Sequence, residues 1–168
     1  MNNDKIFWVG AVFLCLAFVV FAGYRRYNED STAATAMPSA YWLTDFDKAK
    51  QLARQQDKDL LIDFAGSDWC YWCKKLDREV FSKTAFLEPA GRQFVFVLID
   101  FPNDTSGQSD ELQKQNERLA QQFGVQGFPT VFLADADGRP YAKTGYMEGG
   151  PQAYLDHVKE LRNQKTHP

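Results

Sequence analysis

The residues of this chain with the clearest capacity for chemistry are Cys70 and Cys73, in the stretch Trp69-Cys70-Tyr71-Trp72-Cys73-Lys74. The stretch follows a strand-like run over residues 60–64 and stands at the start of a predicted helix, where two thiols at this spacing can close a small disulfide. Unpaired backbone N–H groups and the positive end of the helix dipole favour the thiolate of the first cysteine. Because the thiolate is the species that attacks disulfides, the spacing predicts a redox centre.

The same cysteine spacing also occurs in zinc sites, in haem attachment sites and in structural disulfides. Zinc needs four ligands, whereas the other candidates are Cys15, in an apolar run, and His157 and His167, which lie ten residues apart. Covalent haem would need a histidine after the second cysteine, a position that Lys74 holds. A structural disulfide normally links distant segments. We therefore expect no metal and no cofactor other than the redox-active disulfide itself.

Composition indicates one globular domain. Without its first ~40 residues the chain keeps about 128, which is enough for a hydrophobic core. The formal net charge is −3 and no run of lysine and arginine follows one face, so nucleic-acid binding is not expected. Three cysteines are too few for a scaffold held together by disulfides. We expect a monomer.

The N-terminal part of the chain is predicted to be separate from this domain. Residues 6–23 carry no charge over roughly 18 residues, about the minimum for a helix that spans a bilayer. We predict a signal anchor over residues 1–26, with a cleaved signal peptide as the alternative. Residues 27–42 are mostly small and polar, which is typical of a flexible linker, and the domain is predicted over residues 43–165.

The charges beside the apolar run give conflicting indications of membrane orientation. Lys5 precedes the run while Arg25 and Arg26 follow it, which favours a cytoplasmic domain by the positive-inside rule. Glu29 and Asp30 follow at once, and an N-terminal anchor before a folded domain is the usual arrangement for export. We predict an anchored domain on the extracytoplasmic, periplasmic face, with the cytoplasmic face as the alternative.

Hydrophobic periodicity predicts helices and strands that alternate along the domain. The expected helices cover residues 45–56, which Thr44 would cap, 70–81, 85–92, 110–122 and 151–162. The expected strands cover residues 60–65, 94–99, 130–134 and 141–144. The first two strands should be parallel and joined by a right-handed crossover, and the last two should form an antiparallel hairpin. This order predicts a three-layer α/β sandwich.

Two separated motifs in the right order make the chain resemble the thioredoxin superfamily. They are Trp69-Cys70-x-x-Cys73 and Gly127-Phe128-Pro129-Thr130, and the resemblance covers about residues 45–161. Residues 66–70 and 144–146 further resemble membrane-tethered thioredoxin-like domains, such as the C-terminal domain of transmembrane thiol:disulfide interchange proteins. The resemblance implies a thioredoxin-like α/β/α sandwich with a mixed central sheet.

Specific roles at the redox centre follow from this resemblance. Cys70 would be the exposed nucleophile and Cys73 the more buried resolving thiol. Pro129 would form a cis peptide bond that places the backbone of Phe128 against the cysteine pair, where it can pair with a substrate strand. A plain turn proline is the alternative for Pro129.

Asp63 resembles the buried acid that exchanges a proton with the resolving cysteine in thioredoxins, and a solvated carboxylate at the end of a strand is the alternative. It stands seven residues before Cys70, one more than the usual spacing, which implies a one-residue insertion within residues 66–68. The lysine that often accompanies this acid on the next strand corresponds to Phe96 here. Burial is expected to raise the pKa of Asp63.

Three aromatic residues surround the two thiols. Trp69 could bind an extended partner or pack on its own domain, and both interpretations stay open. Tyr71 and Trp72 lie between the cysteines and are expected to be exposed. They are therefore predicted to bind the substrate, because exposed aromatic side chains beside a reactive group usually mark an interaction site. The acidic segment over residues 100–110 is interpreted as a solvated loop without a role.

Together these observations predict a membrane-tethered thiol–disulfide oxidoreductase. Its expected partners are protein thiol and disulfide substrates and an upstream thiol reductant. The Tyr71-Trp72 dipeptide brings no histidine or other cation to stabilise the thiolate, which favours a reductant over an oxidant. A disulfide oxidase or isomerase acting through the same residues is one alternative. A non-catalytic binding module with structural cysteines is another.

Overall fold

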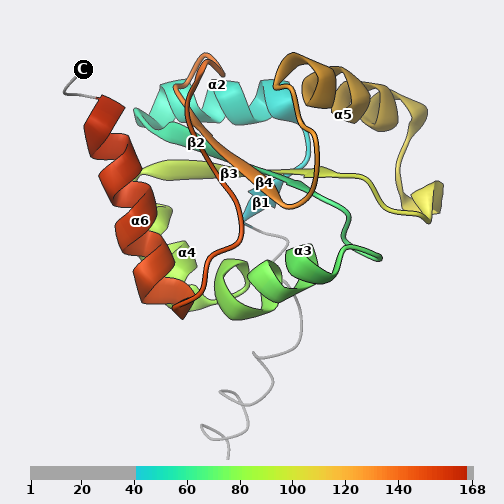
Figure 1. Ribbon diagram of the computed structural model, residues 1–168. Coiled ribbons are helices and arrows are strands. Elements are labelled where there is room, and N and C mark those ends of the chain that lie inside the picture. The colour runs from blue at the N-terminus through green and yellow to red at the C-terminus, as the bar shows by residue number, and fades with distance from the viewer. Residues whose placement is uncertain (1–40, 166–168) are drawn as a thin grey trace, which may run out of the picture. The chain divides into compact units, whose positions relative to one another are not determined.

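The computed structural model describes residues 41–165, in which a mixed sheet lies between two layers of helices (Figure 1). The predicted anchor over residues 1–26 and residues 27–40 of the predicted linker lie outside that range. Within it, no helix is both long and apolar enough to cross a membrane.

The central sheet has five strands. These are β1 (Trp42–Leu43), β2 (Asp59–Ala65), β3 (Phe94–Asp100), β4 (Thr130–Ala134) and β5 (Pro140–Thr144). Their order is β1-β3-β2-β4-β5, in which β1, β3 and β2 are parallel, β4 is antiparallel to β2, and β5 is antiparallel to β4. The predicted parallel pair and the predicted hairpin are both confirmed.

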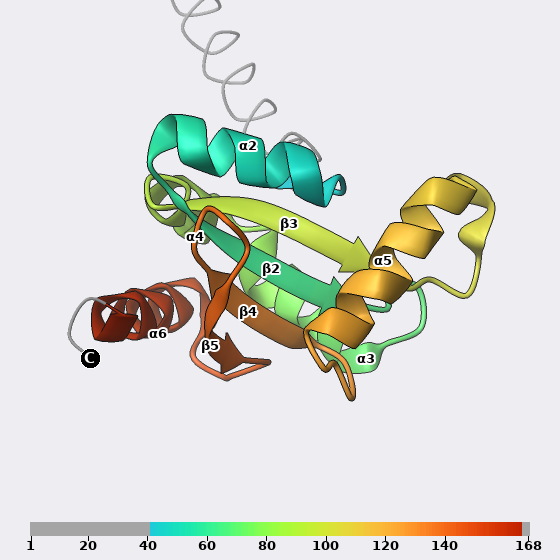
Figure 2. The ribbon, with the colours of Figure 1, turned by 90° about the horizontal axis from the view of Figure 1, so that it is seen from above.

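Helices cover both faces of this sheet (Figures 1 and 2). One layer contains α2 (Phe46–Gln56) and α5 (Asp110–Gln122), and the other contains α3 (Tyr71–Leu76), α4 (Thr84–Ala90) and α6 (Gly150–Lys165). A π-helical turn, η1 (Asp77–Phe81), continues α3, and a short 3₁₀ turn, η2 (Thr105–Gly107), precedes α5. The three-layer α/β/α sandwich with a mixed sheet is therefore confirmed.

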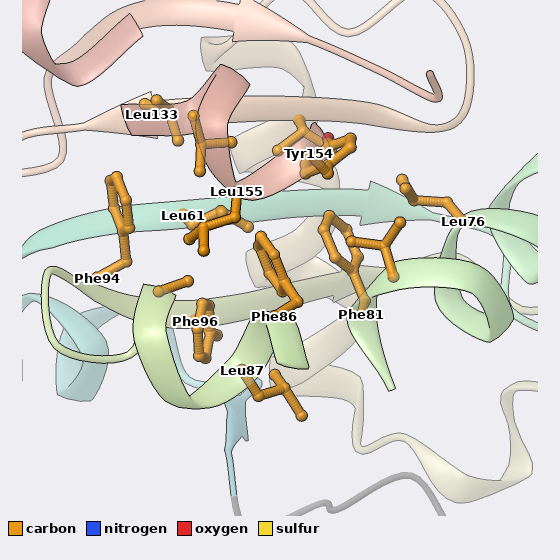
Figure 3. Close-up of a cluster of buried hydrophobic side chains, with 14 of the residues drawn as sticks. Leu61, Leu76, Phe81, Phe86, Leu87, Phe94, Phe96, Leu133, Tyr154 and Leu155 are labelled. Carbon is orange, nitrogen blue, oxygen red and sulfur yellow. The ribbon is translucent and has the colours of Figure 1, made fainter. Parts of the chain in front are cut away.

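Alternating side chains of β2 divide the core into two apolar layers. Leu60, Ile62 and Phe64 point to the layer under α2 and α5, whereas Leu61 points to the layer under α4 and α6. Figure 3 shows Leu61 in this second layer, among aromatic and leucine side chains from α4, α6 and β3. Because side chains alternate along a strand, Asp63 belongs to the same face as Leu61, and a carboxyl group thus enters an otherwise apolar layer.

Strand β1 was not predicted from the sequence. Its two residues pair in parallel with β3, and Trp42, which was assigned to the linker, is buried. The Trp42 ring lies 5.0 Å from the ring of Phe81 and 5.2 Å from that of Phe96, measured between centroids. A two-residue strand is too short to produce a periodic pattern, so tertiary contacts alone identify it.

The N-cap of α2 is Asp45 and not the predicted Thr44. The Asp45 carboxylate accepts the Lys48 N–H at 3.0 Å, and its negative charge also favours the helix N-terminus. The backbone carbonyl of Thr44 instead accepts a hydrogen bond from the Gln115 amide at 2.8 Å. Gln115 also accepts the Phe46 N–H at 3.0 Å, so this one side chain joins α5 to the start of α2.

A buried carboxylate attaches α6 to the start of β2. Asp59 accepts hydrogen bonds from Arg162 Nε at 2.9 Å, from Lys165 Nζ at 2.8 Å and from the Tyr141 hydroxyl at 3.0 Å. Both cations come from the last turns of α6, where positive charge is also favoured by the helix dipole. The cluster fixes α6 against the sheet at the opposite end of β2 from the cysteines.

We expect Asp59→Asn to lower the free energy of unfolding by about 1–3 kcal/mol, because the two cations and the hydroxyl would lose their charged acceptor. Urea unfolding at pH 7 followed by circular dichroism measures this change. The matched control is Asp156→Asn, an exposed acid on α6 that accepts a hydrogen bond from Gln152 and takes no part in the cluster. Equal stability of the two variants would contradict a stabilising role for the cluster.

Candidate active site

A disulfide joins Cys70 and Cys73 at the start of α3. Cys70 is the N-cap residue of the helix, the two Cα atoms lie 5.3 Å apart, and the Cys73 N–H donates to Cys70 Sγ at 3.2 Å. The expected contrast between an exposed first cysteine and a buried second one is wrong for this disulfide form, because the two residues are 6% and 5% exposed. The two cysteines form one small buried cluster with Ala65, and the side chains of Leu98 and Phe128 pack against this cluster.

The second motif lies beside this disulfide because β4 pairs antiparallel with β2. Phe64, near the end of β2, pairs with Thr130, the first residue of β4, so the chain just before β4 meets the chain just after β2. The Phe128–Pro129 peptide bond is cis, as the resemblance implies, and Phe128 packs against the cysteine cluster. Thr130 Oγ1 donates to the Gly127 carbonyl at 2.7 Å and closes this loop.

Asp63 is buried on the face of β2 that the α3 layer covers, so the alternative of a solvated carboxylate is wrong. Its Oδ1 atom has no hydrogen-bond partner among residues 41–165. Burial, and then the nearby carboxylates of Asp77 and Asp100, raise the pKa of Asp63 to about 8. A carboxyl group with this pKa can both hold and release a proton near neutral pH.

Asp77 is a second acid at this site that the sequence analysis missed. It follows Cys73 by four residues, its N–H bonds the Cys73 carbonyl, and it begins the π-helical turn η1. Its Oδ1 atom also lacks a hydrogen-bond partner in the described part of the chain, and burial raises the pKa of Asp77, an effect that Lys83 opposes. Its spacing of four from Cys73, on the face that carries the buried Leu76 and Val80, could have identified it.

The residue beside Asp63 on the neighbouring strand is Leu98. The register of β2 and β3 pairs Asp63 with Leu98 and Leu61 with Phe96, so Phe96, which was assigned to the lysine position, lies opposite Leu61 and not opposite Asp63. Strand register depends on pairing partners and is not fixed by either strand alone. Because Leu98 is also apolar, the paired position offers no cation to Asp63.

Exposed aromatic side chains surround the disulfide. Trp69, Tyr71 and Trp72 are 46%, 63% and 48% exposed and make up most of the large exposed apolar side chains among the described residues. The Trp72 ring lies 5.1 Å from the ring of Tyr146, in the segment between β5 and α6. Lys75 Nζ lies over both rings, at 5.2 Å and 4.9 Å from their centroids. Tyr146 therefore belongs to the surface that the sequence analysis described from the cysteine motif alone.

The acidic segment over residues 100–110 also contacts the site, which corrects its interpretation as a solvated loop without a role. The Asp100 carboxylate accepts the backbone N–H of Ser67 at 2.9 Å and the Ser67 hydroxyl at 2.6 Å. The side chain of Asp100 thus holds the turn that precedes Cys70. Within residues 41–165, no group of histidine, cysteine and acidic side chains could hold a metal ion.

Comparisons with known proteins agree with this geometry. The family model described as a thioredoxin-like domain matches residues 46–159. The chain is similar to disulfide bond reductase DsbH of Chlamydia pneumoniae, with 32% identity over 91% of this chain and 95% of the relative. A solved structure of a DsbH oxidoreductase matches with a TM-score of 0.67 and 33% identity, over 71% of this chain and 82% of that chain.

The chain is also similar to the thiol:disulfide interchange protein DsbD of Vibrio vulnificus strain CMCP6. The two are 29% identical over 77% of this chain, which spans only 24% of that relative. The likeness therefore concerns one part of a longer protein.

The raised pKa of Asp63 predicts a specific pH dependence of stability. Between pH 4 and pH 8 folded Asp63 holds a proton that the unfolded chain, with an ordinary pKa of 3.8, releases. The free energy of unfolding of the oxidised protein should therefore fall as pH rises through this window, by up to about 1.4 kcal/mol per pH unit. Asp63→Asn should remove this decline.

Denaturant unfolding of the oxidised protein from pH 4 to pH 9 measures the decline. Asp110→Asn, which changes an exposed acid at the start of α5, is the matched control and should keep the wild-type slope. If the slope of Asp63→Asn equals that of the wild type, the assigned pKa is wrong.

Proposed function

The chain belongs to the thioredoxin-like domain family, and from this premise we propose that it reduces disulfides in protein substrates through Cys70 and Cys73. Its general activity is thiol–disulfide oxidoreduction. The observation that carries the proposal is the Cys70–Cys73 disulfide at the start of α3, beside the loop that contains the cis Phe128–Pro129 bond. Similarity to a disulfide bond reductase over nearly the whole chain supports the reducing direction.

The reaction transfers two electrons from the dithiol to the substrate. The Cys70 thiolate attacks one sulfur of the substrate disulfide, a mixed disulfide forms, and the other substrate sulfur leaves as a thiolate and takes up a proton. Cys73 then loses its proton and attacks Cys70 Sγ. The second substrate thiol leaves, the Cys70–Cys73 disulfide forms, and an upstream thiol donor reduces it for the next cycle.

Asp63 is the proposed acceptor of the Cys73 proton in the second step. The supporting observations are its burial on the face of the sheet that α3 covers and its pKa of about 8. Asp77 supports this role, because its carboxylate raises the pKa of Asp63 and it lies one helical turn after Cys73. Proton transfer to such a group is favoured when its pKa lies near the operating pH.

Substrate binding is proposed for the surface around the disulfide. The backbone of Phe128 would pair with an extended segment of the substrate, in the manner of strand addition. The exposed side chains of Tyr71 and Trp72 would contact the same segment, and Trp69 would support it from the other side of Cys70.

We further propose that the protein acts as a monomer anchored in a membrane, with its domain on the extracytoplasmic face. The support is the uncharged run over residues 6–23 and the likeness of the domain to part of a thiol:disulfide interchange protein.

The direction of electron flow is tested by the reduction potential of the cysteine pair. Purified protein is equilibrated in glutathione buffers, its free thiols are alkylated, and the modified fraction is measured by mass spectrometry. We expect one two-electron transition with a midpoint near or below about −230 mV, as suits a reductase. A midpoint of about −120 to −180 mV would indicate an oxidase or isomerase, and the absence of a transition would indicate a binding module.

A second prediction concerns the mixed disulfide. In a Cys15→Ala background, Cys73→Ser should accumulate covalent adducts with proteins that carry disulfides, because the intermediate on Cys70 can no longer be resolved. Non-reducing electrophoresis detects these adducts, and dithiothreitol should release them. The matched control carries Cys70→Ser as well and should form none. If Cys73→Ser formed no adducts under thiol stress, the proposed order of attack would be wrong.

A further inference from the structure

The turn before Cys70 is tied to the segment after β3 by a second carboxylate besides Asp100. Asp68 accepts the backbone N–H of Asn103 at 2.9 Å with one oxygen and that of Asp104 at 3.0 Å with the other. These two bonds keep the pKa of Asp68 below its ordinary value, so the group stays ionised near neutral pH. Hydrogen bonds to an ionised acceptor are stronger than those between neutral groups.

Asp68 and Asp100 make reciprocal connections between the two segments. Asp68 reaches from the turn to backbone donors of the segment, and Asp100 reaches from the end of β3 to the donors of Ser67 in the turn. We call these two carboxylates and their four hydrogen bonds the clasp. The turn and the segment are thus held to each other by acceptors on both sides.

The residue held between these connections is Trp69. Its indole N–H donates to the Phe101 carbonyl at 2.8 Å, and its ring meets the ring of Phe128 edge to face at 5.8 Å. Phe101 also contacts Phe128, with ring centroids 5.3 Å apart. A Cβ atom on Gly66 would lie 2.5 Å from the indole, so the ring also packs closely on the turn itself. Trp69 is thus fixed on several sides although nearly half of it is exposed.

We propose that Asp68 and Asp100 are positioning residues that hold Trp69 in one orientation, so that the reduced enzyme presents a preformed aromatic contact to polypeptide substrates. This inference depends on the proposed reductase function and adds the residues that make the site prefer polypeptide disulfides, whose flanking chain reaches Trp69, over small disulfides. An aromatic side chain that is already ordered loses little entropy when a partner binds. A small disulfide reaches the Cys70 sulfur without needing this contact.

Asp68→Asn weakens the clasp with little change in shape. An asparagine offers one acceptor oxygen for two N–H donors and turns its own amide donors toward the second. Pre-reduced protein is mixed with either insulin or glutathione disulfide, and the second-order rate constant is measured in a single turnover. We expect the rate constant for insulin to fall about three- to tenfold, while that for glutathione disulfide changes less than twofold.

Asp110→Asn is the matched control, because it removes the same charge from the end of the same acidic segment. Asp110 is an exposed acid in the first turn of α5 and takes no part in the clasp. Both of its rate constants should stay within about twofold of the wild type. Unchanged insulin reduction by Asp68→Asn would overturn the inference, and so would an equal loss with both substrates, since that result places the effect on the cysteines.

A double-mutant cycle tests whether Asp68 acts through Trp69. Trp69→Ala alone should slow insulin reduction, and Asp68→Asn should add less than twofold in the Trp69→Ala background. Additive losses would overturn the positioning role. If the wild-type protein reduces neither substrate, the proposed function itself fails and the inference fails with it. If the wild-type protein reduces insulin but the effects of Asp68→Asn and Trp69→Ala are additive, the inference alone is rejected and the proposed function stands.

Discussion

The antiparallel pairing of β4 with β2 is the constraint on which the rest of the site depends. It places Thr130, at the start of β4, opposite Phe64, near the end of β2. The chain runs from this end of β2 into the cysteine turn, and the loop with the cis Phe128–Pro129 bond leads into β4 at the same end of the sheet. In a fully parallel sheet, the start of β4 would lie at the opposite end of the strands, and the two motifs would be separated by the length of the strands.

The same central strand brings a carboxyl group under the cysteine helix. The alternation of side chains along β2 places Asp63 in the apolar layer, and burial is the main cause of its raised pKa. The helix then contributes Asp77 to the same region, at the point where its hydrogen bonding changes to the π form. Among the described residues Asp63 Oδ1 has no hydrogen-bond partner, which reduces stability, and the proposed transfer of a proton from Cys73 would give this cost a purpose. The fold thus accepts a local cost beside the reacting thiols.

The surface of the site is assembled from segments far apart in the chain. Trp69 stands beside Cys70 but is held by the Phe101 carbonyl, and the Trp72 ring packs at a tilt against that of Tyr146 from the segment after β5. The clasp connects the turn before Cys70 to the chain after β3. An aromatic contact on a mobile turn would lose more conformational freedom on binding than one fixed by such connections. Contacts with distant segments therefore fix the positions of the side chains around the short cysteine motif.

Sequence alone determined the order of most elements and the cysteine pair, because local periodicity and residue spacing express these features directly, and the resemblance of the Gly127–Thr130 motif implied the cis proline. It also indicated a buried role for Asp63. It could not determine β1, which is too short for a pattern, or the pairing of Asp63 with Leu98, which depends on strand register. Asp77 could have been found from its spacing of four from Cys73, but only the tertiary structure decided that Asp100 and Tyr146 belong to the site. Their roles arise from contacts across the chain, and local sequence carries no direct record of such contacts.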